Sequence, residues 1–333
     1  DGIHLIAAPF FEYRRSDDGI EALAYLRKDD AALAQRYLDA TARYLAIYRN
    51  MIGAYPYAKF ALVENFWETG YGMPSFTLMG SQVIRLPFIV DSSYPHEILH
   101  NWWGNGVYVD YRNGNWAEGL TAYLADHLLQ EQKGNGAEHR RATLQKYADF
   151  VTAGRDFPIT EFTSRHSAQS EAVGYGKTML VFHMLRRRLG DENFTRALQH
   201  LYRDYQFKRA SFADVGRTFS QAAGEDLGPF FAQWVRQAGA PELRLVSAQV
   251  HNDKTRRAGA GFELDITIEQ TQPGPAYALD LPLAVTLAGK EDAYSTVLKM
   301  KDKRAEWRVP FDRQPLRVDV DPEFDVFRRL DSS

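Results

Sequence analysis

The sequence predicts an α+β fold whose parts follow one another along the chain: a small N-terminal mixed sheet, a mainly helical region and a C-terminal β-sandwich. Short strand-like runs open the chain, helical patterns continue without interruption over residues 136–238, and short alternating apolar runs replace them from Leu243 onward. With 333 residues, of which 45% are hydrophobic, the chain is long enough to bury more than one core.

The N-terminal region combines strands with one long helix. Runs of strand-forming residues bounded by turn residues predict strands at 3–12, 19–27, 59–63 and 83–90. Residues 30–52 repeat apolar residues at helical spacing and stop near Gly53, and a loop rich in glycine, proline and aromatic residues is expected at 66–80. Because the first run already resembles a strand in mid-fold, we expect residues 1–30 to be the remnant of an upstream β region and the chain to be a piece of a longer protein.

Helices are predicted for the middle of the chain. The segment Asp91-Ser92-Ser93 supplies capping candidates for a helix at 94–104, which has Pro95 in its first turn, where proline is tolerated. A connection rich in glycine and asparagine leads to a second helix at 116–131. Five further helices are predicted at 137–152, 172–189, 192–206, 211–223 and 227–238.

The last part of the chain has the pattern of a small β-sandwich. Six β-type segments with turns between them lie at 243–250, 262–268, 283–287, 295–300, 307–309 and 316–320. The change of pattern places a boundary near Ala240-Pro241. We therefore expect one domain over residues 1–240 and a β-sandwich domain over residues 241–333.

The composition excludes several classes of function. A net charge of −3 gives no electrostatic footprint for nucleic acid. No apolar run reaches the roughly 18 residues of a membrane-spanning helix, so no span is expected in this chain. The chain contains no cysteine, so any metal site must use histidine and carboxylate ligands. The compartment stays open, with an extracytoplasmic location favoured over a cytoplasmic one.

The segment His96-Glu97-Ile98-Leu99-His100 has the pattern of a zinc site with a general base built into it. Histidines at i and i+4 of a helix lie on one face, so both imidazoles can reach the same metal ion. Glu97 points about 100° around the helix from His96, where it can hold a metal-activated water instead of the metal. Such a string also arises by chance on solvated helix faces. Here the surrounding apolar residues predict a buried helix, in which an unpaired histidine pair would be costly.

A third metal ligand must come from another part of the chain, and Glu118, in the next predicted helix, is the candidate. With His96, His100 and Glu118 as ligands, the fourth position is left for water, which is the arrangement of catalytic rather than structural zinc. We therefore predict one zinc ion per chain.

Five segments of the sequence occur in a specific order: Tyr55–Phe60, His96–Asn105, Trp116–Tyr123, Gly174–Lys177 and Phe231–Pro241. In this order they resemble the aminopeptidase N-like family of gluzincin zinc metallopeptidases, over roughly residues 50–240. The resemblance implies that residues 1–240 form a thermolysin-like catalytic domain and that the substrate is a peptide or protein. It also nominates Tyr175 to stabilise the oxyanion, while Glu97 moves a proton from water to the leaving amine.

Two departures from the family pattern matter. Seventeen residues separate His100 from Glu118, one fewer than usual, but a shorter loop between two helices need not move either helix. Pro74 stands where the family has the glutamate that binds a substrate's free N-terminal amine, and proline has neither a charge nor a backbone N–H. Glu64 or Glu68 could substitute, although the motif positions neither. The sequence therefore predicts peptide hydrolysis, argues against aminopeptidase specificity, and leaves exo- and endopeptidase action open.

Two other functions remain open at this point. The chain could be a catalytically inactive relative that binds peptides or serves as a scaffold, but the presence of the whole catalytic set argues against this. It could also be a zinc hydrolase of a non-peptide substrate, because the same activated water attacks other electrophiles.

Overall fold

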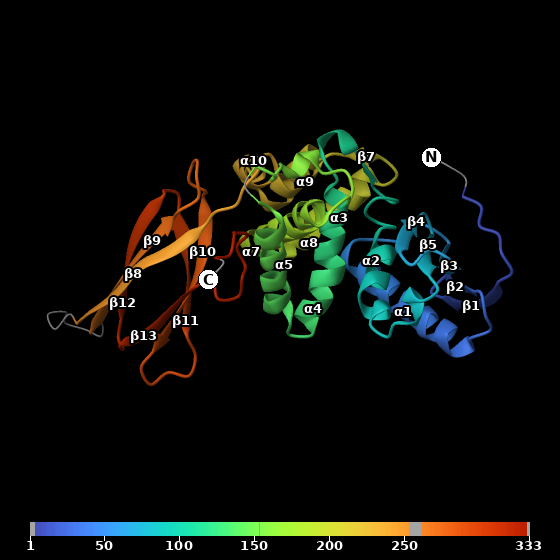
Figure 1. Cartoon of the computed structure of the whole chain (residues 1–333), viewed down its shortest axis with the longest axis horizontal. Coiled ribbons are helices and arrows are strands. Elements are labelled where there is room, and N and C mark those ends of the chain that lie inside the picture. Colours follow the sequence, from blue (N-terminus) through green and yellow to red (C-terminus); the bar gives the residue numbers. More distant parts are fainter. Residues whose placement is uncertain (1–3, 153, 253–260, 332–333) are drawn as a thin grey trace. The chain divides into compact units, whose positions relative to one another are not determined.

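The computed structural model describes residues 4–152, 154–252 and 261–331. The chain forms two compact units, the first made of Asp1–Lys133 and Leu189–Gly228 and the second of Gly134–Arg188 and Pro229–Ser333. The predicted α+β class is confirmed, because a mixed sheet, a helical region and antiparallel C-terminal sheets follow one another along the chain (Figure 1). The division into domains at 1–240 and 241–333 stays a prediction.

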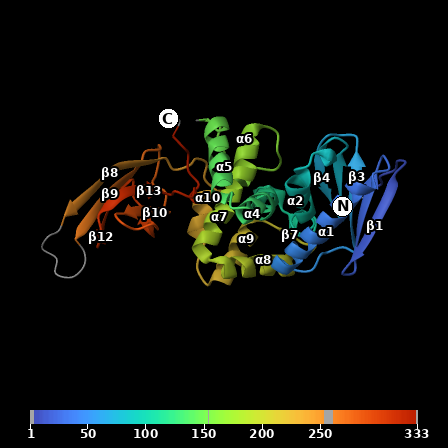
Figure 2. The same ribbon diagram turned by 90° about the horizontal axis from the view of Figure 1, so that it is seen from below.

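The first unit contains a five-stranded mixed sheet in the order β1-β2-β3-β5-β4. Its strands are β1 (Phe11–Asp17), β2 (Ile20–Leu26), β3 (Lys59–Asn65), β4 (Gly70–Met73) and β5 (Phe76–Gly80). Strands β2, β3 and β5 run parallel, whereas β1 and β4 pair antiparallel at the two edges. The parallel pair β2–β3 requires a crossover, which is supplied by α1 (Ala31–Met51), beside β1 and β2 in Figures 1 and 2.

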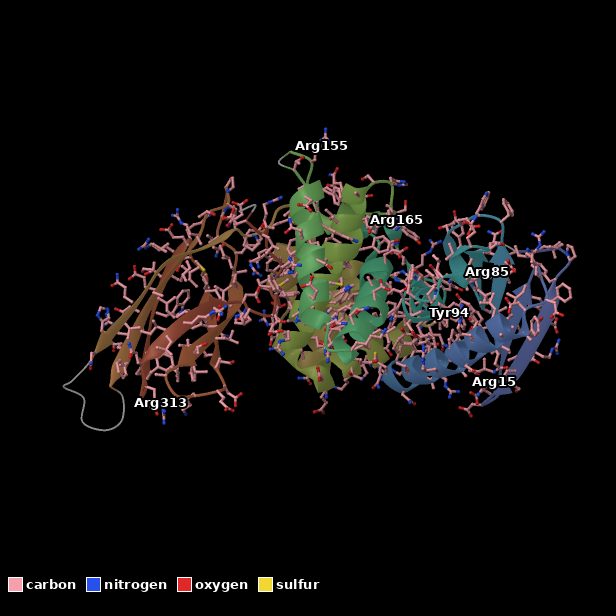
Figure 3. The ribbon with its side chains drawn as sticks, turned by 60° about the horizontal axis from the view of Figure 1, so that its bottom comes forward. Arg15, Arg85, Tyr94, Arg155, Arg165 and Arg313 are labelled. Carbon is pink, nitrogen blue, oxygen red and sulfur yellow. The ribbon has the colours of Figure 1, made fainter. Side chains whose placement is uncertain are left out.

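Helix α1 forms because its sequence supplies both a cap and a buried face. The Asp30 side chain accepts a hydrogen bond of 3.0 Å from the backbone N–H of Leu33. On the buried face, Tyr37 packs edge-on against Tyr94, with ring centroids 4.7 Å apart. The Tyr94 hydroxyl, labelled in Figure 3, lies 2.6 Å from the Thr41 hydroxyl. These contacts join α1 to α2 (Ser93–Leu99), the helix that carries the two histidines of the motif.

Three predictions for the first unit are wrong. Residues 4–10 form no strand, and residues 1–3 lie outside the described part of the chain. The apolar run at 83–90 forms two short 3₁₀ turns, η1 (Val83–Arg85) and η2 (Ile89–Asp91), because a short apolar run alone does not distinguish strand from turn. The predicted loop at 66–80 contains the antiparallel pair β4–β5.

Short elements complete the first unit: β6 (Tyr108–Val109), η3 (Tyr111–Asn113), α3 (Trp116–Thr121), η4 (Ala122–His127), α4 (Leu128–Gln132), α8 (Asp191–Tyr205), β7 (Arg209–Ala210) and α9 (Phe212–Ala223). The helical elements of the second unit are α5 (Gly136–Phe150), η5 (Ile159–Glu161), α6 (Ala168–Glu171), η6 (Ala172–Lys177), α7 (Thr178–Leu189, which ends at the unit boundary) and α10 (Gly228–Val235). The helix predicted at 116–131 is interrupted by the π-helical turn η4, and the helix predicted at 172–189 begins with the π-helical turn η6. Across the described ranges, none of the helices has the length and apolar character that crossing a membrane requires.

The second unit also contains two three-stranded antiparallel sheets, in the orders β12-β9-β8 and β11-β10-β13. Their strands are β8 (Leu243–Asn252), β9 (Phe262–Gln270), β10 (Leu279–Leu287), β11 (Tyr294–Met300), β12 (Arg304–Phe311) and β13 (Pro315–Val320). All six predicted β segments are therefore strands. Alternate residues of the two central strands are buried, as in Ile266 and Ile268 of β9 and Leu281 and Leu283 of β10.

Candidate metal centre

His96 and His100 lie one helical turn apart at the C-terminal end of α2. The helix is shorter than predicted, because it ends at Leu99 and His100 occupies the C-cap position. The two imidazole centroids are nevertheless 4.8 Å apart, and the side chains are only 12% and 13% exposed. The predicted capping is not observed at the N-terminal end, where Ser92 occupies the N-cap position without a capping bond from its side chain.

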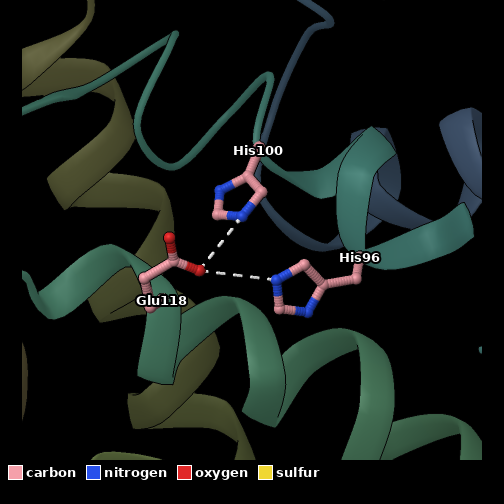
Figure 4. A group of neighbouring side chains, drawn as sticks. All are labelled: His96, His100 and Glu118. Atoms are coloured by element: carbon pink, nitrogen blue, oxygen red, sulfur yellow. Dashed lines mark ion pairs between the residues drawn. The ribbon is translucent and has the colours of Figure 1, made fainter. Parts of the chain in front are cut away.

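Glu118 enters the same space from α3, whose first turn is held by the Asn115 side chain accepting from the backbone N–H of Ala117. One oxygen of its carboxylate, Oε2, lies 3.5 Å from Nε2 of His96 and 3.3 Å from Nε2 of His100 (Figure 4). The three predicted ligand atoms all lie within 4.8 Å of one another. The one-residue shorter connection has therefore not separated the two elements.

The other nitrogen of each imidazole is engaged by a hydrogen-bond acceptor. Nδ1 of His96 lies 3.1 Å from a carboxylate oxygen of Asp126, and Nδ1 of His100 lies 2.9 Å from the carbonyl oxygen of Trp103. A carbonyl can only accept, so Nδ1 of His100 carries a hydrogen, and in the neutral imidazole Nε2 then presents a lone pair towards Glu118. This arrangement is the one that orients histidine ligands in metal sites.

The electrostatics of the group favour a positive charge among these side chains. Burial alone would lower the pKa of both imidazoles, but the carboxylates of Asp126 and Glu118 outweigh burial and raise it. Burial would likewise raise the pKa of the Glu118 carboxyl, but the two imidazoles hold it far below its usual range. A bound cation would supply the positive charge that this arrangement favours.

The donor set fits zinc. A tetrahedral ion with ligand bonds of about 2.1 Å holds its ligand atoms about 3.4 Å apart, which matches the two histidine–glutamate distances. Oε2 of Glu118 is buried and accepts no hydrogen bond from the described residues, although it lies close to both Nε2 atoms. A buried carboxylate oxygen without a donor is costly unless a cation binds it.

The carboxylate of Glu97 lies against the edge strand β4. A Cβ atom built on Gly70 would lie 2.9 Å from its Oε1, and one built on Gly72 would lie 2.8 Å from its Oε2 and 3.0 Å from Cβ of His100. A side chain at either position would therefore force the Glu97 carboxylate to shift. Burial raises the pKa of Glu97 above its ordinary value.

The turn from β4 to β5 consists of Pro74 and Ser75, with Met73 paired to Phe76. Ser75 has a φ of +67°, as the second central residue of a type II turn requires, and proline suits the first. The side chain of Asn101, next to His100, accepts a hydrogen bond of 2.8 Å from the backbone N–H of Ser75. The turn that carries Pro74 is therefore attached to the end of the histidine helix.

Both glutamates considered as substitute amine ligands accept hydrogen bonds from other parts of the chain. Glu64 is buried and accepts hydrogen bonds from the backbone N–H of Arg27 at 2.6 Å and from the guanidinium of Arg85 at 2.7 Å (Arg85 is labelled in Figure 3). Glu68 accepts from the backbone N–H groups of Gln82 and Val83, at 2.9 and 3.1 Å. Glu64 thus binds the last residue of η1, and Glu68 binds the backbone at its start.

Tyr175 lies in the second unit, in the π-helical turn η6. Its ring packs edge-on against Phe162, with centroids 5.8 Å apart. Gly174 permits this contact, because a Cβ atom there would lie 2.2 Å from the Phe162 ring. The role of Tyr175 as an oxyanion donor stays a prediction.

Asp126 is the functional candidate that the sequence analysis missed. It lies in η4, eight positions after Glu118, and a π-helical turn changes which residues of a helix share a face. The sequence offers one indication of such a residue, because each ligand histidine has to donate its second N–H to an acceptor. This requirement does not identify which residue is the acceptor.

Comparison with protein families matches residues 90–234 to the peptidase family M1 domain. The chain is 27% identical over 167 residues to Aminopeptidase N of Lactococcus lactis subsp. lactis, covering 47% of this chain and 19% of that protein. It is 24% identical over 241 residues to Probable aminopeptidase 1 of Saccharolobus solfataricus, covering 69% and 30%. It is 21% identical over 254 residues to the Alanine/arginine aminopeptidase of Saccharomyces cerevisiae, covering 71% and 29%. The chain thus matches less than a third of the length of each of these relatives.

Proposed function

We propose, from the membership of this chain in peptidase family M1, that it is a zinc-dependent peptidase acting on peptides or proteins. The observation that carries the proposal is the convergence of the three ligand atoms of His96, His100 and Glu118 within 4.8 Å. The half-buried carboxylate of Glu97 lies next to this group, on the same helix as the two histidines.

His96, His100 and Glu118 would hold the zinc ion. When bound, zinc supplies a Lewis acid that polarises the substrate carbonyl and lowers the pKa of a water molecule to about 7. Asp126 and the Trp103 carbonyl hold both imidazoles through Nδ1, with each Nε2 facing Glu118, and would thereby orient them as ligands.

Glu97 acts as the general base and then as the general acid. It takes a proton from the attacking water as the water oxygen bonds to the carbonyl carbon, and it returns that proton to the nitrogen as the C–N bond breaks. Burial supports this role, because the raised pKa of Glu97 makes its carboxylate a better proton acceptor than an exposed glutamate.

Tyr175 donates a hydrogen bond from its phenol to the oxygen that becomes negative during the attack. A phenol is suited to this because it is neutral near pH 7 and donates without carrying charge. The π-helical backbone at Tyr175 supports the assignment, since such turns are frequent at functional sites.

The substrate is proposed to bind without a carboxylate that pairs with its N-terminal amine. Pro74 occupies the expected position of that carboxylate, and Glu64 and Glu68 are engaged elsewhere. Strand β4 is an edge strand beside Glu97, and an edge strand can pair with an extended peptide. We therefore propose cleavage of peptides whose N-terminus is blocked or distant from the scissile bond.

A peptide-library digest with and without a metal chelator tests the proposed activity. The protein should cleave peptides, the chelator should stop cleavage, and Glu97→Gln should abolish it while zinc stays bound. The matched control Glu306→Gln, at an exposed position on β12, should cleave like the unmodified protein. Zinc binding without cleavage of any peptide would instead favour an inactive relative or a hydrolase of another substrate class.

A further inference from the structure

Lys177 is among the least exposed charged side chains of the described residues. It closes η6, two positions after Tyr175, and only 1% of it is exposed. Lysine is almost never fully buried without a partner, because desolvating an ammonium group is costly. Burial lowers the pKa of Lys177 to about 8, while the nearby Asp156 carboxylate acts in the opposite direction. A group kept at such a cost calls for a physical explanation.

The ammonium group of Lys177 binds the segment that connects α10 to β8. Nζ donates hydrogen bonds of 3.0 Å to the carbonyl oxygens of both Gln237 and Gly239. Nζ also lies 5.4 Å from the centre of the Phe327 ring. The C-terminal end of η6 is therefore tied to a segment about sixty positions further along the chain.

That segment is itself held in place. The backbone N–H of Gly239 donates to a carboxylate oxygen of Asp156, and the same oxygen accepts a hydrogen bond of 2.6 Å from the Tyr147 hydroxyl. Gly239 has a φ of +96°, which a residue with a side chain would rarely adopt. Lys177 thus binds a segment that is itself held by hydrogen bonds within the second unit.

The glycines on either side of Tyr175 leave η6 no free space. Gly174 lies against the Phe162 ring, as described above, and a Cβ atom on Gly176 would lie 3.0 Å from Cγ2 of Thr143 in α5. The turn therefore packs closely against Phe162 and Thr143 at the two glycines, and the Lys177 hydrogen bonds restrain the same turn.

We infer that Lys177 is a positioning residue that fixes the π-helical turn η6 and, through it, the direction of the Tyr175 phenol. The inference rests on the proposed role of Tyr175 in oxyanion stabilisation. Removing the ammonium would leave two carbonyl oxygens without their donor and release one restraint on the turn. Because misplacing a catalytic group by about 1 Å can cost about 100-fold in rate, a small rotation is sufficient to matter.

A double-mutant cycle on kcat and KM tests the inference, using zinc-loaded protein and a peptide identified in the library digest. Lys177→Met should lower kcat about 10- to 100-fold with KM and zinc content unchanged. Tyr175→Phe should lower kcat at least as much, and the double variant should be no slower than Tyr175→Phe alone. Lys299→Met, at an exposed position on β11, is the matched control and should leave kcat unchanged.

The outcomes separate the two claims. If Tyr175→Phe lowers kcat and Lys177→Met does not, or if the two losses multiply in the double variant, the positioning role of Lys177 is wrong and the role of Tyr175 stands. If Tyr175→Phe keeps full kcat, the proposed oxyanion role fails, and with it the positioning role. If Lys177→Met does not fold, the same cycle with Lys177→Gln, which keeps a donor, gives the decision.

Discussion

A Cβ atom at Gly72 would lie 2.8 Å from Oε2 of Glu97, so a side chain at this position of β4 would force the carboxylate to shift. We predict that Gly72→Ala displaces the Glu97 carboxylate and lowers kcat about 100-fold, because the proposed general base is then misplaced. The same Cβ atom would lie 3.0 Å from Cβ of His100, so the zinc content of the variant is measured together with kcat. Gly261→Ala is the control, since a Cβ atom there meets nothing within 4 Å. Unchanged kcat in Gly72→Ala would mean that Glu97 does not need its present position.

The contact between Asp126 and Nδ1 of His96 predicts an effect on metal affinity. Asp126→Asn removes the charge that favours the N–H at Nδ1, and we expect zinc to bind about 10- to 100-fold more weakly in a competition titration with a chelator. Asp39→Asn, in an exposed ion pair with Arg15, should bind zinc like the unmodified protein. Equal affinities for both variants would contradict the role of Asp126.

The buried ammonium of Lys177 predicts a pH dependence of stability. The pKa of Lys177 is about 8 in the folded chain and 10.5 for an unburied lysine. Between these pH values the unfolded chain therefore holds a proton that the folded chain has released. The free energy of unfolding should therefore rise between pH 8 and pH 10.5, by about 3 kcal/mol, relative to that of Lys177→Met. Urea unfolding of both proteins across this range measures the difference. A difference independent of pH would show that Lys177 titrates normally.

The engaged carboxylates of Glu64 and Glu68, together with Pro74, predict tolerance of blocked substrates. Truncating a buried ion pair costs about 2 kcal/mol or more, or about 30-fold, so a site with an amine ligand should lose at least this factor in kcat/KM when the peptide is acetylated. We expect the kcat/KM values of the free and N-acetylated versions of one peptide to differ by less than this factor. If acetylation abolished cleavage, an amine-binding group other than these two glutamates would exist.

The local parts of the fold and the site could be predicted from the sequence. His96 and His100 meet because helical spacing alone places them on one face, and the six C-terminal strands follow from alternating apolar residues. The strand pair β4–β5 could not be predicted, because four residues containing two glycines carry little strand signal.

Features that depend on distant contacts were also missed. Asp126 reaches His96 through a π-helical turn that no residue pattern indicates, and the engagement of Glu64 depends on Arg27 and Arg85 from other elements. The sequence predicts a strand at 83–90, but this run forms 3₁₀ turns. The turns could not be predicted, because they follow from packing rather than from composition.

Metal analysis tests the proposed site most directly. The purified protein should contain one zinc ion per chain, and Glu118→Gln should lose that zinc together with peptide cleavage, whereas Glu306→Gln should keep both. Full zinc content in Glu118→Gln would contradict the proposal, because the ion would then be held by a different set of residues.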